Sequence, residues 1–220
     1  MDRQIINKRI TGIQNEVEKL VRTLRAMEHT DLASYPENYE MLSTDAALRG
    51  ELITCRLRHL IYSTTSIKKS DYLTSAGVVQ GIEIKCEDGI LEITLPCLLP
   101  KRKQRRSTEF LIDPLYFTLD SYAMNHKLPH FVQCVVCFSN VYNRELPARR
   151  ARDYDNLELK QILDVVSAFV MVDDTGLLCD AYNTTELGES DCTRITVMGK
   201  DRFAEWIEAH KNSLEDISDF

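Results

Sequence analysis

Two pairs of acidic residues bracket a stretch with the pattern of an amphipathic helix in the second half of the chain. Asp153 and Asp155 precede this stretch, and Asp173 and Asp174 follow it. Side chains two residues apart in an extended chain point the same way, so a strand that ends at Asp153 would carry the first pair on one face. Carboxylate oxygens are the ligands that Mg2+ takes in proteins. We therefore expect the four carboxylates to meet at one edge of a sheet and to hold Mg2+, which would polarise a phosphoryl oxygen and activate water.

The residues between the two acidic pairs predict the elements that position them. Four apolar residues recur at helical spacing and predict a helix over residues 157–169. These are Leu159, Ile162, Leu163 and Val166. The apolar run over residues 168–172 predicts a short buried strand that ends at Asp173 and Asp174.

The same acidic residues also fit a purely structural interpretation. Asp155 followed three positions later by Glu158 is a capping-box pattern, in which both side chains bond free backbone N–H groups at a helix start. Asp173, Asp174 and the glycine at Gly176 suit a hairpin turn. On this interpretation the carboxylates are caps and turn residues and hold no metal.

The acidic block resembles the motif of the RusA-like Holliday junction resolvases. That family has a D-x-D-N-L stretch, a lysine, an L-D-x-L helical turn and a closing D-D. The matching residues here are Asp153, Asp155, Asn156, Leu157, Lys160, Asp164, Asp173 and Asp174. The strand-like residues 92–96 and the basic residues 101–106 are similar to the family's opening strand and basic segment. The resemblance covers roughly residues 88–200, and Lys160 lies four residues after Asn156 where the family usually has three.

This resemblance implies an activity and a role for each matched residue. Enzymes of the family cut four-way DNA junctions as homodimers with Mg2+, and their aspartates hold the metal. The implied catalytic residues are Asp153, Asp155, Asp174 and Lys160, and the implied metal ligands are Asp153, Asp155, Asp173 and Asp174. The chain is thus expected to be a Mg2+-dependent endodeoxyribonuclease for branched DNA, acting in recombination and repair. Such enzymes are often carried by mobile elements.

Two basic clusters could bind DNA although the formal net charge is −7. DNA binding depends on local Lys and Arg contacts to phosphates, so the sign of a surface counts for more than the total. The clusters comprise Lys101, Arg102, Lys103, Arg105 and Arg106, and then Arg149, Arg150 and Arg152, of which Arg152 could also contact the scissile phosphate. Their alternative interpretation is a solvated loop face.

Cysteine usage and hydropathy predict a cytoplasmic protein with no membrane segment. The chain has 7 cysteines, an odd and scattered set, and no apolar run long enough to span a bilayer. No signal peptide is recognised at the start of the chain. Cys134 and Cys137 lie in an apolar strand-like run and are expected to act as small hydrophobes rather than zinc ligands.

The first part of the chain predicts a helical hairpin. Residues 4–28 carry an apolar seam at coiled-coil spacing, and residues 44–67 carry a second. The first seam is Ile6, Ile10, Ile13, Val17, Leu20, Leu24 and Met27, and the second is Ile53, Leu57, Leu60, Thr64 and Ile67. Such a hairpin could stabilise the fold, form a homodimer or dock a protein partner.

The rest of the chain predicts an α+β domain with a mixed sheet covered by helices. The hydrophobic period changes to two near residue 81, and an Asp-Gly turn at residues 88–89 predicts a β-hairpin. Further strands are expected at residues 131–138, 177–182 and 193–198, with an exposed acidic loop between the last two. We therefore expect a hairpin over residues 1–75 and a RusA-like nuclease domain over residues 76–220.

Two other functions remain open from the sequence. The domain could be a nuclease-derived module that no longer cuts and serves in DNA binding or protein interaction. It could also be a structural protein that never meets DNA, which would be favoured if the basic clusters lay on opposite faces.

Overall fold

The computed structural model describes residues 3–99, 109–145, 151 and 153–211. The chain divides into two compact units, Met1–Lys69 and Ser70–Phe220. The division falls before the boundary at residue 75 that the sequence predicts, because α3 (Lys69–Gln80) belongs almost entirely to the second unit.

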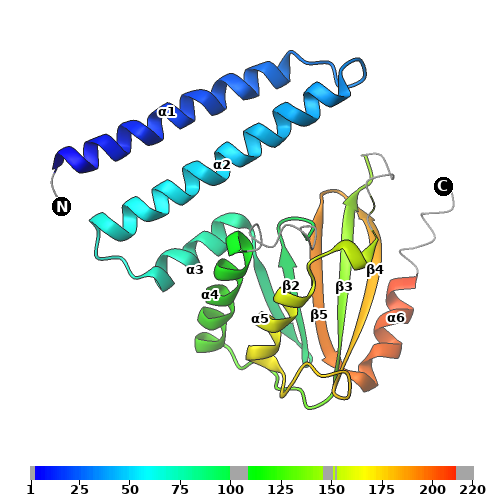
Figure 1. Ribbon diagram of the computed structural model, residues 1–220. Helices are drawn as coiled ribbons and strands as arrows, with labels where there is room; N and C mark the ends of the chain where they lie inside the picture. Colours follow the sequence, from blue (N-terminus) through cyan, green and yellow to red (C-terminus); the bar gives the residue numbers. More distant parts are fainter. Residues whose placement is uncertain (1–2, 100–108, 146–150, 152, 212–220) are drawn as a thin grey trace. The chain divides into compact units, whose positions relative to one another are not determined.

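The first unit is a pair of antiparallel helices, α1 (Arg3–Glu28) and α2 (Pro36–Thr64) (Figure 1). The second helix begins eight residues earlier than expected because Pro36 is compatible with the first helical turn, where its missing N–H is not needed. It ends at Thr64, since Thr65 is extended, and Ile67 therefore lies outside the helix.

Part of the predicted seam of α1 does not face α2. Ile13 is buried as expected, whereas Ile10, Val17 and Leu24 are 39%, 41% and 48% exposed. The residues one position earlier, Arg9, Glu16 and Thr23, contact α2 instead. The same spacing of three and four residues also links positions 9, 13, 16, 20 and 23, so the apolar pattern does not fix the rotation of α1. Polar contacts between α1 and α2 fix this rotation.

The second unit contains one five-stranded mixed sheet in the order β1-β2-β5-β3-β4. Its strands are β1 (Glu83–Glu87), β2 (Ile90–Leu95), β3 (Cys134–Asn143), β4 (Cys179–Gly188) and β5 (Cys192–Gly199). Only β3 and β4 pair in parallel, and the other neighbours are antiparallel. The Asp-Gly hairpin is confirmed, because Asp88 and Gly89 both have positive φ in a two-residue turn between paired Glu87 and Ile90.

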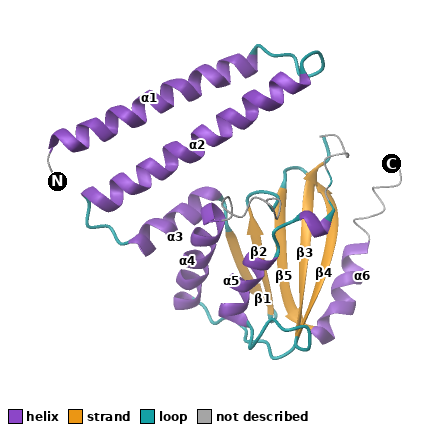
Figure 2. Cartoon of the chain, viewed as in Figure 1, coloured by secondary structure: helices purple, strands orange, loops and turns teal. Residues whose placement is uncertain are grey.

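Helices cover both faces of this sheet, which confirms the predicted α+β class (Figure 2). One face packs under α4 (Glu109–Asn125) and α5 (Lys160–Val170), with fully buried Leu115, Leu119 and Ile162. The other face packs under α6 (Phe203–Lys211), where Trp206 is a core residue. The apolar cores on the two faces of the sheet pack it against α4 and α5 on one side and against α6 on the other.

The elements next to the acidic residues differ from the prediction. No strand ends at Asp153, because β3 ends at Asn143 and Asp153 directly precedes a 3-10 turn over Tyr154–Asn156. The expected strand over residues 168–172 is also wrong. The helix α5 continues to Val170, since Val166 and Val170 extend its buried face by one further turn. Only Met171 makes an isolated bridge, to Phe131.

The acidic loop expected after residue 182 is in part a strand. Glu186 lies within β4, is 8% exposed and pairs with Arg194 of β5 at 2.9 Å. The paired arginine makes burial of this carboxylate tolerable. Within the described residues, no helix is long and apolar enough to cross a membrane.

Candidate acidic site

The structure describes the acidic half of the predicted site and leaves out the basic half. All four aspartates and Lys160 lie among the described residues. The predicted DNA-binding residues lie outside them: Lys101, Arg102, Lys103, Arg105, Arg106, Arg149, Arg150 and Arg152. The described part of the site therefore consists of its carboxylates, Lys160 and the sheet beneath them.

Lys160 occupies the first turn of α5 and pairs with a helical neighbour. Its Nζ donates to Asp164 Oδ1 at 2.9 Å and to Oδ2 at 3.3 Å. This hydrogen bond and the charge of Asp164 raise the pKa of Lys160, and the charges of Asp174 and Glu158 raise it further. The lysine is thus oriented by its own helix and stays protonated at neutral pH.

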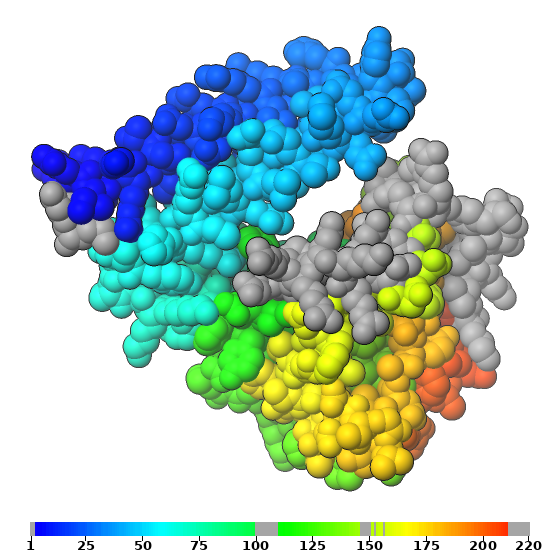
Figure 3. Space-filling view, in the orientation of Figure 1, coloured from blue at the N-terminus to red at the C-terminus, as the bar shows by residue number. Residues whose placement is uncertain are grey.

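The two acidic segments lie toward opposite ends of β4. Tyr154, in the turn that carries Asp155, contacts Thr185 in the second half of β4. Asp173 and Asp174 lie in the loop that leads from α5 into the first residue of β4. The fold therefore does not bring the two segments together at one end of α5, although the charge of Asp174 acts on Lys160. Helix α5 and the loop after it form part of the surface of the second unit (Figure 3).

The structural interpretation of the acidic residues holds for Asp173 but not for the helix cap. Asp173 Oδ1 accepts a hydrogen bond from the Thr175 backbone N–H at 3.2 Å, an Asx turn. This turn leads from α5 to β4 rather than joining two strands of a hairpin. No capping box forms, because α5 begins after Leu159 without a side-chain cap and Glu158 is buried, with 4% of its surface exposed.

The four carboxylates do not form a metal cage in the arrangement described. Carboxylates are the ligand type that Mg2+ takes. However, within the described ranges no three His, Cys, Asp or Glu side chains come together as ligands for one ion. Asp173 is held in its turn, and Asp174 lies near Lys160. The aspartates supply the right chemistry for Mg2+ without the assembled geometry.

A buried polar group beneath the turn that carries Asp155 was not identified from the sequence. Asn140 of β3 has no exposed surface, and neither its Oδ1 nor its Nδ2 has a hydrogen-bond partner. It is paired in register with Thr185 of β4 and Thr193 of β5. Tyr154, in the turn that carries Asp155, contacts Thr185 Oγ1 through its hydroxyl at 2.8 Å. Asn140 directly follows the apolar run of a strand, and this position is the feature of the sequence that could have identified a buried amide.

The fold and the site define an α+β protein with a helical hairpin, a mixed five-stranded sheet and acidic segments before and after α5. The chain belongs to a family of unknown function, DUF6100, which matches it over residues 2–220. The match spans both units, so the hairpin is part of the family's architecture. No curated protein matches the chain.

Proposed function

We propose that this protein is a Mg2+-dependent, structure-selective endodeoxyribonuclease that acts on branched DNA, as the resemblance to the RusA-like resolvases implies. One observation carries the proposal. The charge of Asp174 acts on Lys160, so the lysine and the closing aspartate of the motif interact although 14 positions separate them in the sequence.

The chemistry of these residues supports the proposal further. Carboxylates are the ligand type of hard divalent cations, and a bound Mg2+ would supply charge stabilisation for phosphodiester hydrolysis. Lys160, kept protonated by Asp164, would contact the anionic phosphate. Asp153 and Asp155 are exposed and Asp174 is half-buried, so DNA could reach them.

Cleavage of a synthetic four-way junction tests the proposal. We expect the wild-type chain to cut the junction in Mg2+ and to leave a linear duplex of the same sequence intact. The Asp155→Asn variant should not cut. Asp71→Asn, in the first turn of α3, is a matched charge change outside the site and should cut like the wild type. A folded wild-type protein that cuts neither DNA in Mg2+ or Mn2+ would contradict the proposal.

The second candidate function is a nuclease-derived module that binds DNA or a protein without cutting. The turn hydrogen bond of Asp173 and the absence of a three-carboxylate grouping within the described residues favour it. Gel-shift measurement with the same junction separates the two candidates. Binding without cleavage, unchanged by Asp155→Asn, would support the module and exclude the enzyme.

A further inference from the structure

An apolar stripe runs along the outside of α1. Ile10, Val17, Val21 and Leu24 are 39%, 41%, 40% and 48% exposed. Steps of seven, four and three residues place all four on one face of a helix. Gln14 is the only residue that interrupts this face between Ile10 and Leu24. A stripe with this period is the kind that pairs with another helix.

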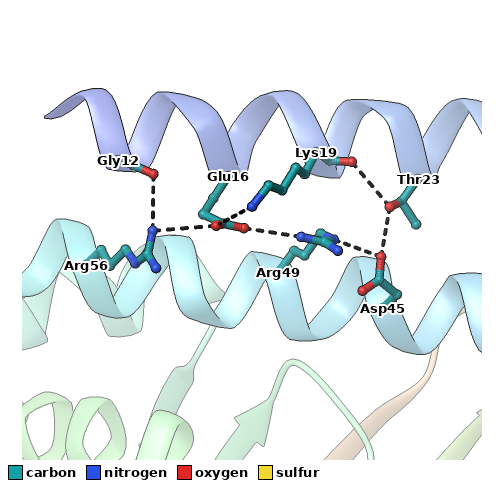
Figure 4. Close-up of polar contacts among 7 residues, drawn as sticks. All are labelled: Gly12, Glu16, Lys19, Thr23, Asp45, Arg49 and Arg56. Carbon is teal, nitrogen blue, oxygen red and sulfur yellow. Dashed lines mark hydrogen bonds and ion pairs between the residues drawn. The ribbon is translucent and has the colours of Figure 1, made fainter. Parts of the chain in front are cut away.

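The inner face of α1 cannot turn to bury this stripe against α2. Glu16 binds Arg49 at 3.2 Å and Lys19 at 3.0 Å, and Thr23 donates to Asp45 at 2.9 Å (Figure 4). Glu16 and Thr23 are each only 9% exposed, so rotating them outward would break ion pairs and leave the partners on α2 unmatched. The polar network fixes the rotation of α1 and leaves its stripe on the outside.

Opposite charges lie at the two ends of the stripe. Arg3 lies seven residues before Ile10, and Glu28 lies four residues after Leu24, so both belong to the same face. Both are exposed, and neither forms an ion pair in the described part of the chain. Two copies of this face have complementary charges when the helices run antiparallel, because Arg3 of each copy then meets Glu28 of the other.

We propose that this stripe is an interaction surface for a second copy of the chain, with the two α1 helices antiparallel about a two-fold axis. Arg3 of each copy then lies opposite Glu28 of the other, and Ile10 lies opposite Val21. A parallel arrangement would instead place Arg3 beside Arg3 and Glu28 beside Glu28. The 26-residue helix is about 39 Å long, so the pair forms a contact along the whole hairpin. Two hairpins joined in this way make a four-helix bundle.

The apolar residues on the outside of α2 suit such a contact less well. Met41, Leu48 and Leu52 are exposed, but Cys55 and His59 continue their face. Those two residues line a groove of about 400 Å3 together with Arg9 of α1 and with Arg56, which pairs with Glu16. The apolar part of this face runs from Met41 to Leu52 and is therefore shorter than the stripe from Ile10 to Leu24.

The mass of the full chain in solution, measured by sedimentation equilibrium over a range of concentrations, tests the stripe. We expect a dimer for the wild type and at least a tenfold weaker dimer for Val17→Glu. Leu48→Glu makes the same change on α2, where the side chain is 60% exposed, and should leave the dimer intact. Circular dichroism should show equal helix content in all three proteins. A monomeric wild type, or dissociation caused by Leu48→Glu but not by Val17→Glu, would overturn the proposal.

A charge exchange tests the antiparallel orientation independently of the stripe. Arg3→Glu and Glu28→Arg should each weaken the dimer, because each places like charges together at both ends. The double variant should restore the wild-type dimer, since its charges are again opposite when the helices are antiparallel. Failure of the double variant to restore it would exclude this orientation. The inference does not rest on DNA cleavage, and its tests use no DNA.

Discussion

Replacing Asn140 by leucine should stabilise the second unit. The side chain of Asn140 is completely buried, and neither atom of its amide has a hydrogen-bond partner. A buried polar group left without a partner costs about 1–3 kcal/mol, whereas leucine has a similar shape and no such group. We expect Asn140→Leu to raise the free energy of unfolding by about 1–3 kcal/mol. At about 2–4 °C per kcal/mol, this corresponds to a rise in Tm of roughly 2–12 °C.

Urea unfolding followed by tryptophan fluorescence measures this effect in the correct unit. The chain has 1 tryptophan, and Trp206 is 7% exposed in the core beneath α6. Its fluorescence therefore reports unfolding of the second unit. The midpoint of the transition should move to higher urea concentration without a change in its slope.

Thr193→Val is the matched control because Thr193 is the register neighbour of Asn140 on β5. Thr193 is also fully buried, but its Oγ1 donates to the Cys97 carbonyl at 3.0 Å. Losing a satisfied hydrogen bond should lower the stability by about 0.5–1.5 kcal/mol. The two variants should therefore shift stability in opposite directions. If Asn140→Leu destabilises the protein as Thr193→Val does, the amide of Asn140 is satisfied in the folded protein and the reasoning is refuted.

Three further predictions follow from burial and charge. Ile162→Ala in α5 should lower the stability by about 2–5 kcal/mol in the same urea assay, because the side chain is fully buried. Burial raises the pKa of Cys134 and of Cys137 to about 12, so at pH 8 Ellman's reagent should label exposed Cys55 and leave both unmodified until the protein unfolds. The hydrogen bond from Lys19, with the charges of Arg56 and Arg49, lowers the pKa of Glu16 below 4.5. The lowered pKa of Glu16 thus stabilises the folded form above pH 4.5, and this stabilisation is lost as the pH falls through the pKa of the folded state. The helical circular dichroism of Glu16→Gln should therefore depend less on pH in the acid range than that of the wild type.

The sequence predicted the fold class because the hydrophobic periods are clear. The change from a helical period to alternation near residue 81 marks the start of the sheet, and Asp88-Gly89 identifies its first hairpin. The same reasoning failed near Ala168, where a continuous apolar run fits either a buried strand or the end of a buried helix. The structure extends α5 to Val170 there.

The rotation of α1 could not be predicted from apolar spacing. Ile10 and Val17 fit the coiled-coil spacing, and Arg9 and Glu16, one position earlier, fit it equally well. What decides between the two faces is the pairing of Glu16 with Arg49 and of Thr23 with Asp45, and these contacts join residues 33 and 22 positions apart. A single sequence gives the apolar period but not these long-range partners.

The candidate site was predictable as a set of residues but not as an arrangement. The D-x-D-N-L block and the closing Asp173-Asp174 can be read directly from the sequence. The separation of the two acidic segments, the Asx turn at Asp173 and the buried amide of Asn140 depend on tertiary packing. None of these has a local sequence signal strong enough to establish it.

Junction cleavage by Asp174→Asn, compared with Asp180→Asn, tests the central claim most directly. The charge of Asp174 acts on the motif residue Lys160, whereas Asp180 of β4 pairs with Lys200 at 2.8 Å. The account predicts that Asp174→Asn abolishes Mg2+-dependent cutting of a four-way junction and that Asp180→Asn cuts like the wild type. Equal cutting by both variants would contradict it.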